Sequence, residues 1–208
     1  MVDANKNALL SHYHVSRESL KALDTYVGLL TFWQRRVNLI GPSTVDQIWS
    51  RHILDAAQLL PLLPAGTSRI ADLGTGAGIP GLILALLGPY DVYLYESNGK
   101  KVAFLREAIR VTGARATVMQ MRLEALTAAT ALPDVDVVVS RALAPLDRLL
   151  SYASVFLGRG AIGLFHKGQD VDSELTEATK YWRINLIKHL SVTDSRGVIL
   201  EVREAVRV

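Results

Sequence analysis

The fold of this chain is decided by the stretch Asp72-Leu-Gly-Thr-Gly-Ala-Gly-Ile-Pro80. Its first two residues end the short apolar run Ile70-Ala-Asp-Leu73, and it precedes the apolar segment 82–87, so it is expected to leave a strand and open a helix. Proline suits the first helical turn, because its missing N–H would have no helical partner there. Glycines let the backbone pass close beneath a ligand, and the helix N-terminus offers free N–H groups. The stretch therefore predicts a nucleotide-binding loop.

Apolar runs and amphipathic segments alternate along the rest of the chain. An N-terminal helix is expected from a Ser16 cap through Val37, and a second from Ser43 or Thr44 to about Leu59. Further strands are expected at 92–96, 117–120, 136–140, 161–165, 184–190 and 198–205, and helices at 80–87, 100–112, 123–129, 145–157 and 173–182. Alternating strands and helices indicate a parallel sheet covered on both faces. The turn Asp194-Ser-Arg-Gly joins the last two strands in a hairpin.

This organisation is an α/β fold with a doubly wound, Rossmann-like sheet and an N-terminal helical cap. We expect residues 1–66 to form the cap and residues 67–208 the main domain, in one compact unit. The length of 208 residues fits that number of domains.

Composition narrows the class of protein further. Half of the residues are hydrophobic (50%) and 21% are charged, which is typical of a globular protein. The chain has no cysteine, which excludes disulfides, thiolate metal sites and a cysteine nucleophile, and no metal is expected. Its polar start and its lack of a long apolar run predict a cytoplasmic protein without a membrane segment. The net charge of +3 is compatible with a polyanionic partner without requiring one.

The spacing of the glycine loop indicates which nucleotide it binds. In a dinucleotide fingerprint counted from Gly74, the third glycine would fall on Ile79. The spacing here resembles instead the first motif of class I S-adenosylmethionine methyltransferases. The Asp72 carboxylate suits the methionine ammonium, reached directly or through water, whereas it would repel a pyrophosphate. Glu96 ends the next strand, where a carboxylate can accept hydrogen bonds from both ribose hydroxyls.

The methylated atom is constrained by what the sequence lacks. Amino-methylating enzymes of this class often carry Asn/Asp-Pro-Pro-Tyr/Phe after the fourth strand, but here Ser140-Arg-Ala-Leu-Ala-Pro145 follows it. Pyrimidine carbon methylation normally uses a cysteine, and this chain has none. A ring nitrogen such as guanine N7, a hydroxyl and a carboxylate all stay open. For guanine N7 no proton has to be removed, so catalysis would rest mainly on orientation.

Several motifs together resemble the bacterial RsmG (GidB) family of 16S ribosomal RNA methyltransferases. They are Asn38-Leu39, Arg51-His-Ile-Leu-Asp55, Gly74-Thr-Gly-Ala-Gly-Ile-Pro-Gly81, Glu96-Ser-Asn-Gly-Lys-Lys-Val-Ala-Phe-Leu105, Ser140-Arg-Ala-Leu-Ala and Lys167-Gly168. The resemblance runs from about Leu20 to the C-terminus. It implies methyl transfer from S-adenosylmethionine to guanine N7 in a conserved loop of 16S rRNA. Glu96 stands where the family usually has Asp, a conservative change for binding a ribose.

The expected site residues follow from the loop, the strand ends and this resemblance. Arg141 ends the fourth strand and is expected to contact cofactor or target base; Lys167 follows the fifth strand and is expected to contact a phosphate or guanine O6. These two are the predicted catalytic residues, and they act by fixing the base. The predicted cofactor-binding residues are Asp72, Gly74, Gly76, Gly78, Ile79, Glu96, Ser97, Asn98, Leu123, Glu124 and Arg141.

Basic side chains predict where RNA would bind. The residues assigned to this surface are Arg35, Arg36, Arg51, Lys100, Lys101 and Arg122. Charge runs on helices are often only solvated faces, so both interpretations stay open. His52 lies on an apolar stripe and is expected to be a buried, hydrogen-bonded histidine. Trp33, Trp49 and Trp182 are expected to pack in the core or an interface.

Three other functions compete with an rRNA methyltransferase that binds the small ribosomal subunit as a monomer. A small-molecule methylase would need a closed lid over a deep apolar pocket in place of an open basic face. A ribosome-assembly factor that binds RNA or cofactor without turnover is a second alternative. A dehydrogenase is the least favoured, because the third glycine is misplaced.

Overall fold

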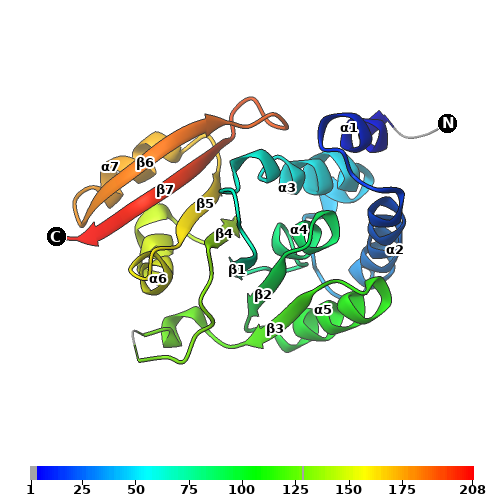
Figure 1. Cartoon of the computed structure of the whole chain (residues 1–208), viewed down its shortest axis with the longest axis horizontal. Coiled ribbons are helices and arrows are strands. Elements are labelled where there is room, and N and C mark those ends of the chain that lie inside the picture. The colour runs from blue at the N-terminus through cyan, green and yellow to red at the C-terminus, as the bar shows by residue number, and fades with distance from the viewer. Residues whose placement is uncertain (1–3, 128) are drawn as a thin grey trace.

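The computed structural model describes residues 4–127 and 129–208 and places a mixed sheet at its centre (Figure 1). The strands are β1 (Arg69–Leu73), β2 (Asp91–Glu96), β3 (Ala116–Gln120), β4 (Val137–Arg141), β5 (Ile162–Lys167), β6 (Trp182–Leu190) and β7 (Val198–Arg207). They form a seven-stranded sheet in the order β3-β2-β1-β4-β5-β7-β6. The first five strands are parallel, and β7 runs antiparallel to β5 and β6. The predicted doubly wound sheet and C-terminal hairpin are confirmed.

Helices cover both faces of the sheet because the strands are apolar on both sides. They are α4 (Gly81–Leu87), α5 (Gly99–Thr112), α6 (Leu146–Leu157) and α7 (Val171–Ala178). Within β1, Ile70 packs in the cluster that contains α4 and α5, whereas Ala71 packs in the cluster that contains α6. This alternation is the period of a strand buried on both faces.

The cap contains α1 (Ala4–His12), α2 (Arg17–Gln34) and α3 (Asp55–Ala57). As predicted, Ser16 caps α2, its Oγ accepting a hydrogen bond of 3.1 Å from Ser19 N. Against α5, the rings of Trp33 and Phe104 meet edge to face at 5.8 Å, so the cap and the sheet share one core. No helix in the described part of the chain is long and apolar enough to cross a membrane.

The prediction of one regular second helix in the cap is wrong. The chain there forms 3-10 helix over Pro42–Gln47, π-helix over Trp49–Leu54, α3, and a last 3-10 turn over Leu60–Leu62. Side chains of the irregular segment are bonded to strands and loops outside it, and such contacts outweigh helical propensity. The helix predicted at 123–129 is a single 3-10 turn, Leu123–Ala125; residue 128 lies outside the described residues.

The strand order places a crevice at the carboxyl ends of β1 and β4. These strands are neighbours, with Asp72 paired to Val139, and the chain winds outward from them in opposite directions. Ligands of open α/β sheets bind at such a switch point. The glycine loop after β1 and the segment after β4 therefore meet where a site is expected.

Candidate functional site

The glycine loop is held between the end of β4 and the cap. Gly74 has a φ of +67°, which glycine adopts at little cost. A Cβ atom on Gly74 would lie 2.4 Å from Leu143 Cδ1, so only glycine lets the loop pass this segment. From the cap, the buried Tyr26 hydroxyl donates a hydrogen bond of 2.8 Å to the Ala77 carbonyl.

Asp72 lies beneath the loop and is completely buried. Its Oδ2 accepts hydrogen bonds from Thr75 Oγ1 at 2.5 Å and from Gly81 N at 2.8 Å. Its Oδ1 has no partner in the described part of the chain. Burial raises the pKa of Asp72 to about 7, against the lowering effect of the bonds from Thr75 and Gly81. Asp72 thus fastens both ends of the loop; its contact with a ligand stays a prediction.

Glu96 ties the loop to the end of β2. Its Oε2 accepts a hydrogen bond of 3.1 Å from Gly76 N, and its Oε1 accepts one of 2.8 Å from Asn98 N. Asn98 in turn caps α5, with Oδ1 accepting from Lys100 N at 2.9 Å. The half-buried carboxylate keeps further lone pairs for hydroxyl donors, as the predicted ribose contact requires.

A cavity of about 300 Å³ opens beside this loop, and we call it the cofactor cavity. Of the predicted cofactor residues it is lined by Gly74, Glu96, Ser97, Leu123 and Glu124. Asp72, Gly76, Gly78, Ile79, Asn98 and Arg141 do not line it. Lys101 and Arg122, which the sequence analysis assigned to RNA, also line the cofactor cavity. The other lining residues include Tyr95, Met121, Leu143 and Tyr152.

The chemistry of the cofactor cavity fits a nucleoside that carries charges of both signs. The carboxylates of Glu96 and Glu124 can accept hydrogen bonds from ribose hydroxyls, the cations Lys101 and Arg122 also border the cavity, and Met121 and Leu123 provide apolar surface for a purine ring. Glu124 is oriented by hydrogen bonds to its Oε1 from Tyr152 Oη at 2.8 Å and from Arg148 Nη2 at 3.0 Å. These residues fit S-adenosylmethionine.

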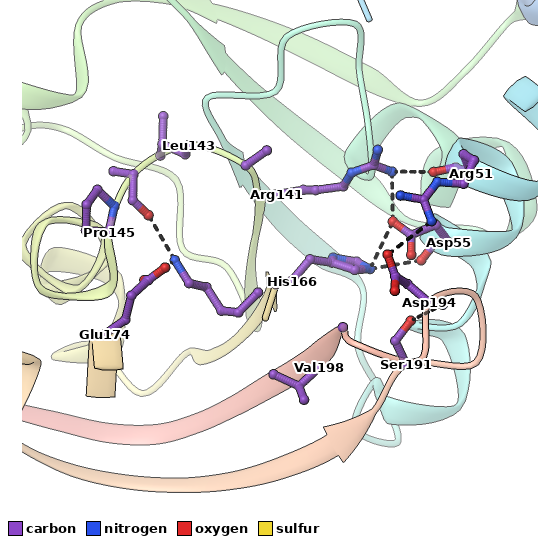
Figure 2. Close-up of a pocket in the computed structure, with 15 residues that line it drawn as sticks. Arg51, Asp55, Arg141, Leu143, Pro145, His166, Glu174, Ser191, Asp194 and Val198 are labelled. Atoms are coloured by element: carbon purple, nitrogen blue, oxygen red, sulfur yellow. Dashed lines mark hydrogen bonds and ion pairs between the residues drawn. The ribbon is translucent and has the colours of Figure 1, made fainter. Parts of the chain in front are cut away.

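A larger cavity of about 570 Å³ lies beyond the segment after β4, and we call it the acceptor cavity (Figure 2). Ala142 and Leu143 line both cavities. Figure 2 shows Glu174 and Pro145 at one side, and Arg141, Asp55 and Asp194 at the other. Ala142 has a φ of +51°, an uncommon conformation for a residue other than glycine. The shared wall is therefore a strained turn, as is common at functional sites.

Lys167 lines the acceptor cavity as the last residue of β5. Its Nζ donates a hydrogen bond of 3.0 Å to the Ala144 carbonyl and forms an ion pair with Glu174 Oε2. The same carboxylate oxygen accepts a bond of 2.8 Å from Leu146 N, where α6 begins. The lysine is thus fixed by two groups, the Ala144 carbonyl after β4 and the Glu174 carboxylate on α7. Its predicted contact with the target stays a prediction.

Arg141 lines the same cavity, but its guanidinium points toward the cap. Nη1 donates to Asp55 Oδ2 at 2.8 Å and to the Arg51 carbonyl at 3.0 Å, and Nη2 bonds His52 Nδ1 at 2.7 Å. Its Nε–H and one Nη2 hydrogen have no acceptor among the described residues. Contact with cofactor or base would use these two donors.

His52 is the buried, hydrogen-bonded histidine that its position predicts. Burial, followed by the charge of Arg141, lowers its pKa to about 4, so the ring is neutral. Nδ1 accepts from Arg141, and Nε2 lies 2.8 Å from Thr44 Oγ1. The proton is therefore assigned to Nε2.

Asp55 joins the cap to the β6–β7 turn. Its Oδ1 accepts from Thr193 Oγ1 at 2.5 Å and from Gln58 Nε2 at 2.7 Å. His166 Nε2 lies 2.9 Å from the Asp55 carbonyl, while the buried Nδ1 of His166 has no partner within the described residues. Burial lowers the pKa of His166, which is therefore neutral.

The basic residues assigned to RNA fall into different places. Three of them are exposed: Arg35 is the C-cap of α2, Arg36 follows it, and Lys100 lies in the first turn of α5. Arg51 pairs with Asp194 at 3.1 Å at the rim of the acceptor cavity. Lys101 and Arg122 line the cofactor cavity.

Sequence reasoning missed the carboxylates of the acceptor cavity. Asp55 was noticed only inside the motif Arg51–Asp55, and Glu174 and His166 were given no role. The one available signal was position: His166 and Lys167 close β5 at the carboxyl edge of the sheet.

Comparisons with known proteins show the family to which the chain belongs. The profile of the family described as rRNA small subunit methyltransferase G matches residues 19–202. The Ribosomal RNA small subunit methyltransferase G of Paramagnetospirillum magneticum is 49% identical, covering 96% of this chain and 95% of its own. The Ribosomal RNA small subunit methyltransferase G of Rhodospirillum rubrum is 50% identical, and the match covers 91% of this chain and 92% of that protein.

Solved structures share the fold at low identity. A ribosomal protein L11 methylase from Lactobacillus delbrueckii subsp. bulgaricus superposes with a TM-score of 0.55 at 18% identity, over 78% of this chain and 79% of its own. A precorrin-6y C5,15-methyltransferase from Geobacter metallireducens gives 0.53 at 16% identity, over 80% and 92%. The predicted methyltransferase fold, the enzyme class and the S-adenosylmethionine donor are confirmed. With the family profile matching most of its length, the chain belongs to the GidB family of rRNA small subunit methyltransferases G.

Proposed function

We propose that this protein transfers a methyl group to N7 of a guanine in 16S rRNA of the small ribosomal subunit. The observation that carries the proposal is the shared wall of Ala142 and Leu143 between the two cavities. A donor in one cavity and a base in the other would meet across this wall. S-adenosylmethionine, when bound, supplies the methyl group.

The glycine loop and the carboxylates of the cofactor cavity are the proposed holding residues. Glu96 accepts hydrogen bonds from the ribose hydroxyls while it keeps the loop closed through Gly76 N. Leu123, Met121 and Glu124 line the cavity, and we assign the first two to the purine ring. Asp72 supports the loop from beneath through its bonds from Thr75 and Gly81.

The target base occupies the acceptor cavity in this proposal. Lys167 has one N–H donor left after its bonds to Ala144 and Glu174, and guanine O6 is a fitting acceptor. The Nε–H and free Nη2 hydrogen of Arg141 are available to the base or its phosphate. N7 carries its own lone pair, so positioning is the main contribution of these side chains.

RNA binding is assigned to the exposed face that includes Arg35, Arg36 and Lys100, with Arg51 at the rim and Lys101 and Arg122 beside the cofactor. In this proposal the cap, residues 1–66, contributes phosphate contacts, and residues 67–208 carry the transfer. The protein acts in the cytoplasm as a monomer on the small subunit or its RNA.

The test is incubation with labelled S-adenosylmethionine and small subunits from cells that lack this methylation. The label should map to one guanine and be cleaved by reduction followed by aniline, which reports N7-methylguanosine. Arg141→Ala and Lys167→Ala should lower turnover strongly. The pH–rate profile should lack a rising limb from a base that titrates near neutrality.

His166 provides the contrary outcome, because it lines the acceptor cavity and its buried Nδ1 has no hydrogen-bond partner among the described residues. Two results together would assign the methyl group to an atom that must first lose a proton: label that resists cleavage, and a rising limb in the pH–rate profile that His166→Asn removes. That result would contradict the guanine N7 proposal.

A further inference from the structure

Each of the two predicted catalytic cations in the acceptor cavity is paired with a carboxylate. Arg141 Nη1 lies 2.8 Å from Asp55 Oδ2, and Lys167 Nζ is paired with Glu174 Oε2. The two carboxylates lie on different sides of the cavity (Figure 2). The lysine side chain is 7% exposed and that of Glu174 is 23% exposed. The charge of the lysine is therefore balanced within the cavity and not by solvent.

Glu174 is held in place independently of the lysine. It lies on α7, and the backbone N–H of Leu146 at the start of α6 donates 2.8 Å to its Oε2. Glu174 lines the acceptor cavity, and no described residue forms a hydrogen bond with its Oε1. The carboxylate is thus a fixed negative charge at the cavity wall.

Methyl transfer moves a positive charge into this cavity. The N7 lone pair forms the new bond to the methyl carbon as the carbon–sulfur bond breaks, and the electron pair of that bond stays on sulfur. The sulfonium becomes a neutral thioether, and the purine ring becomes cationic. An unpaired ammonium beside the ring would oppose this redistribution, whereas a neutralised one would not.

We propose that Glu174 is a positioning residue of the transfer reaction, which neutralises Lys167 so that the lysine can bind the purine without opposing the positive charge formed on it. The inference rests on the proposed transfer to guanine N7. It adds a residue from α7, an element with no predicted role, to the machinery of the site.

Glu174→Gln is the first test, because glutamine keeps an oxygen that can accept from Leu146 N and Lys167. The single-turnover rate with saturating donor and RNA should fall at least tenfold. RNA affinity should be unchanged or tighter, because the cavity gains net positive charge. Glu174→Asp, which keeps the charge, should recover most of the rate. A merely structural role would weaken affinity and rate together and would not depend on charge.

Lys167→Met provides the second test. When the lysine is absent, its charge needs no balance, so Glu174→Gln should change the rate by less than about threefold in that background. Glu177→Gln is the matched control: it removes the same charge from the same helix, where the partner is the surface residue Lys180. Its rate should stay at the native level.

Equal slowing by Glu174→Gln in both backgrounds would overturn the inference, as would parallel loss of RNA affinity and rate, or an unchanged rate. If native protein places its label on N7 and any of these results appears, only the role of Glu174 fails. Label on another atom would remove the charge argument together with the proposed function.

Discussion

Replacing the buried Asp72 by asparagine should make the protein more stable at neutral pH. Burial raises the pKa of Asp72 to about 7 in the folded protein, from a reference value of 3.8. The folded state therefore holds this carboxyl as a neutral acid under conditions in which the unfolded chain ionises it. Asparagine never ionises, and its Oδ1 can accept the bonds that Thr75 Oγ1 and Gly81 N donate to Asp72.

The sign and magnitude of the effect follow from proton linkage. Because the folded pKa is raised, the contribution of Asp72 to stability is complete below about pH 3.8, declines as the pH rises toward 7 and is lost above it. Each pH unit within this interval corresponds to about 1.4 kcal/mol. The stability of Asp72→Asn relative to the native protein should therefore rise by about 3 kcal/mol between pH 4.5 and pH 7.5, and then level off.

Urea denaturation of both proteins, without donor, at one-unit steps from pH 4.5 to pH 8.5 measures this difference. Subtraction cancels the titration of all other groups. Asp136→Asn is the control: although burial raises its pKa, hydrogen bonds from Ser68 and Arg69 lower it overall. The contribution of Asp136 to stability is therefore complete above its ordinary pKa of 3.8 and is lost only at lower pH, so the difference for that variant should stay nearly constant from pH 4.5 to pH 8.5. A flat difference for Asp72→Asn would refute the argument from burial.

Three further predictions concern the loop, the cap and the RNA surface. Gly74→Val should abolish S-adenosylmethionine binding in calorimetry while the protein stays folded, because its side chain would meet Leu143; Gly28→Ala, with open space at its Cβ position, should bind normally, and unchanged affinity of Gly74→Val would contradict the loop assignment. Asp55→Asn should lower the free energy of unfolding by about 3 kcal/mol, because it leaves the largely buried Arg141 charge unpaired. Asp91→Asn, which breaks an exposed pair with Arg115, should have little effect. Equal effects of the two substitutions would contradict the argument that burial makes the Asp55–Arg141 pair important for stability. Neutralising Arg35, Arg36 and Lys100 together should reduce the slope of log affinity against log salt by about 2 if each contacts a phosphate, as filter binding to the RNA at several salt concentrations would show; an unchanged slope would leave them a solvated face.

Sequence patterns correctly predicted the elements whose signals are local. Ser16 caps α2, Gly113 closes α5 with a φ of +70°, and the turn 194–197 joins β6 to β7. Such features depend on residues within a few positions of one another. The glycine loop belongs to this class too, because its context needs only the strand before it and the helix after it.

The irregular backbone of the second segment of the cap could not be predicted from the local sequence pattern. Its apolar stripe is helical in period, yet the backbone changes between 3-10, π and α geometry over Pro42–Leu62. The reason lies outside the segment: His52 bonds Arg141, and Gln58 Oε1 accepts from Val192 N at 2.9 Å. Periodicity within the segment carries no information about these partners.

The sequence by itself determined the class of fold, the position of the loop and the presence of Arg141 and Lys167 at the ends of strands. Only the tertiary structure decided that Asp55 and Glu174 pair with them. Asp55 also bonds Thr193, a residue 138 positions away, and no local pattern indicates which of the 20 acidic residues pairs with a cation so far along the chain. The physical reason is that strand and helix signals are repeated along the chain, whereas an ion pair between distant residues depends on how packed elements are juxtaposed.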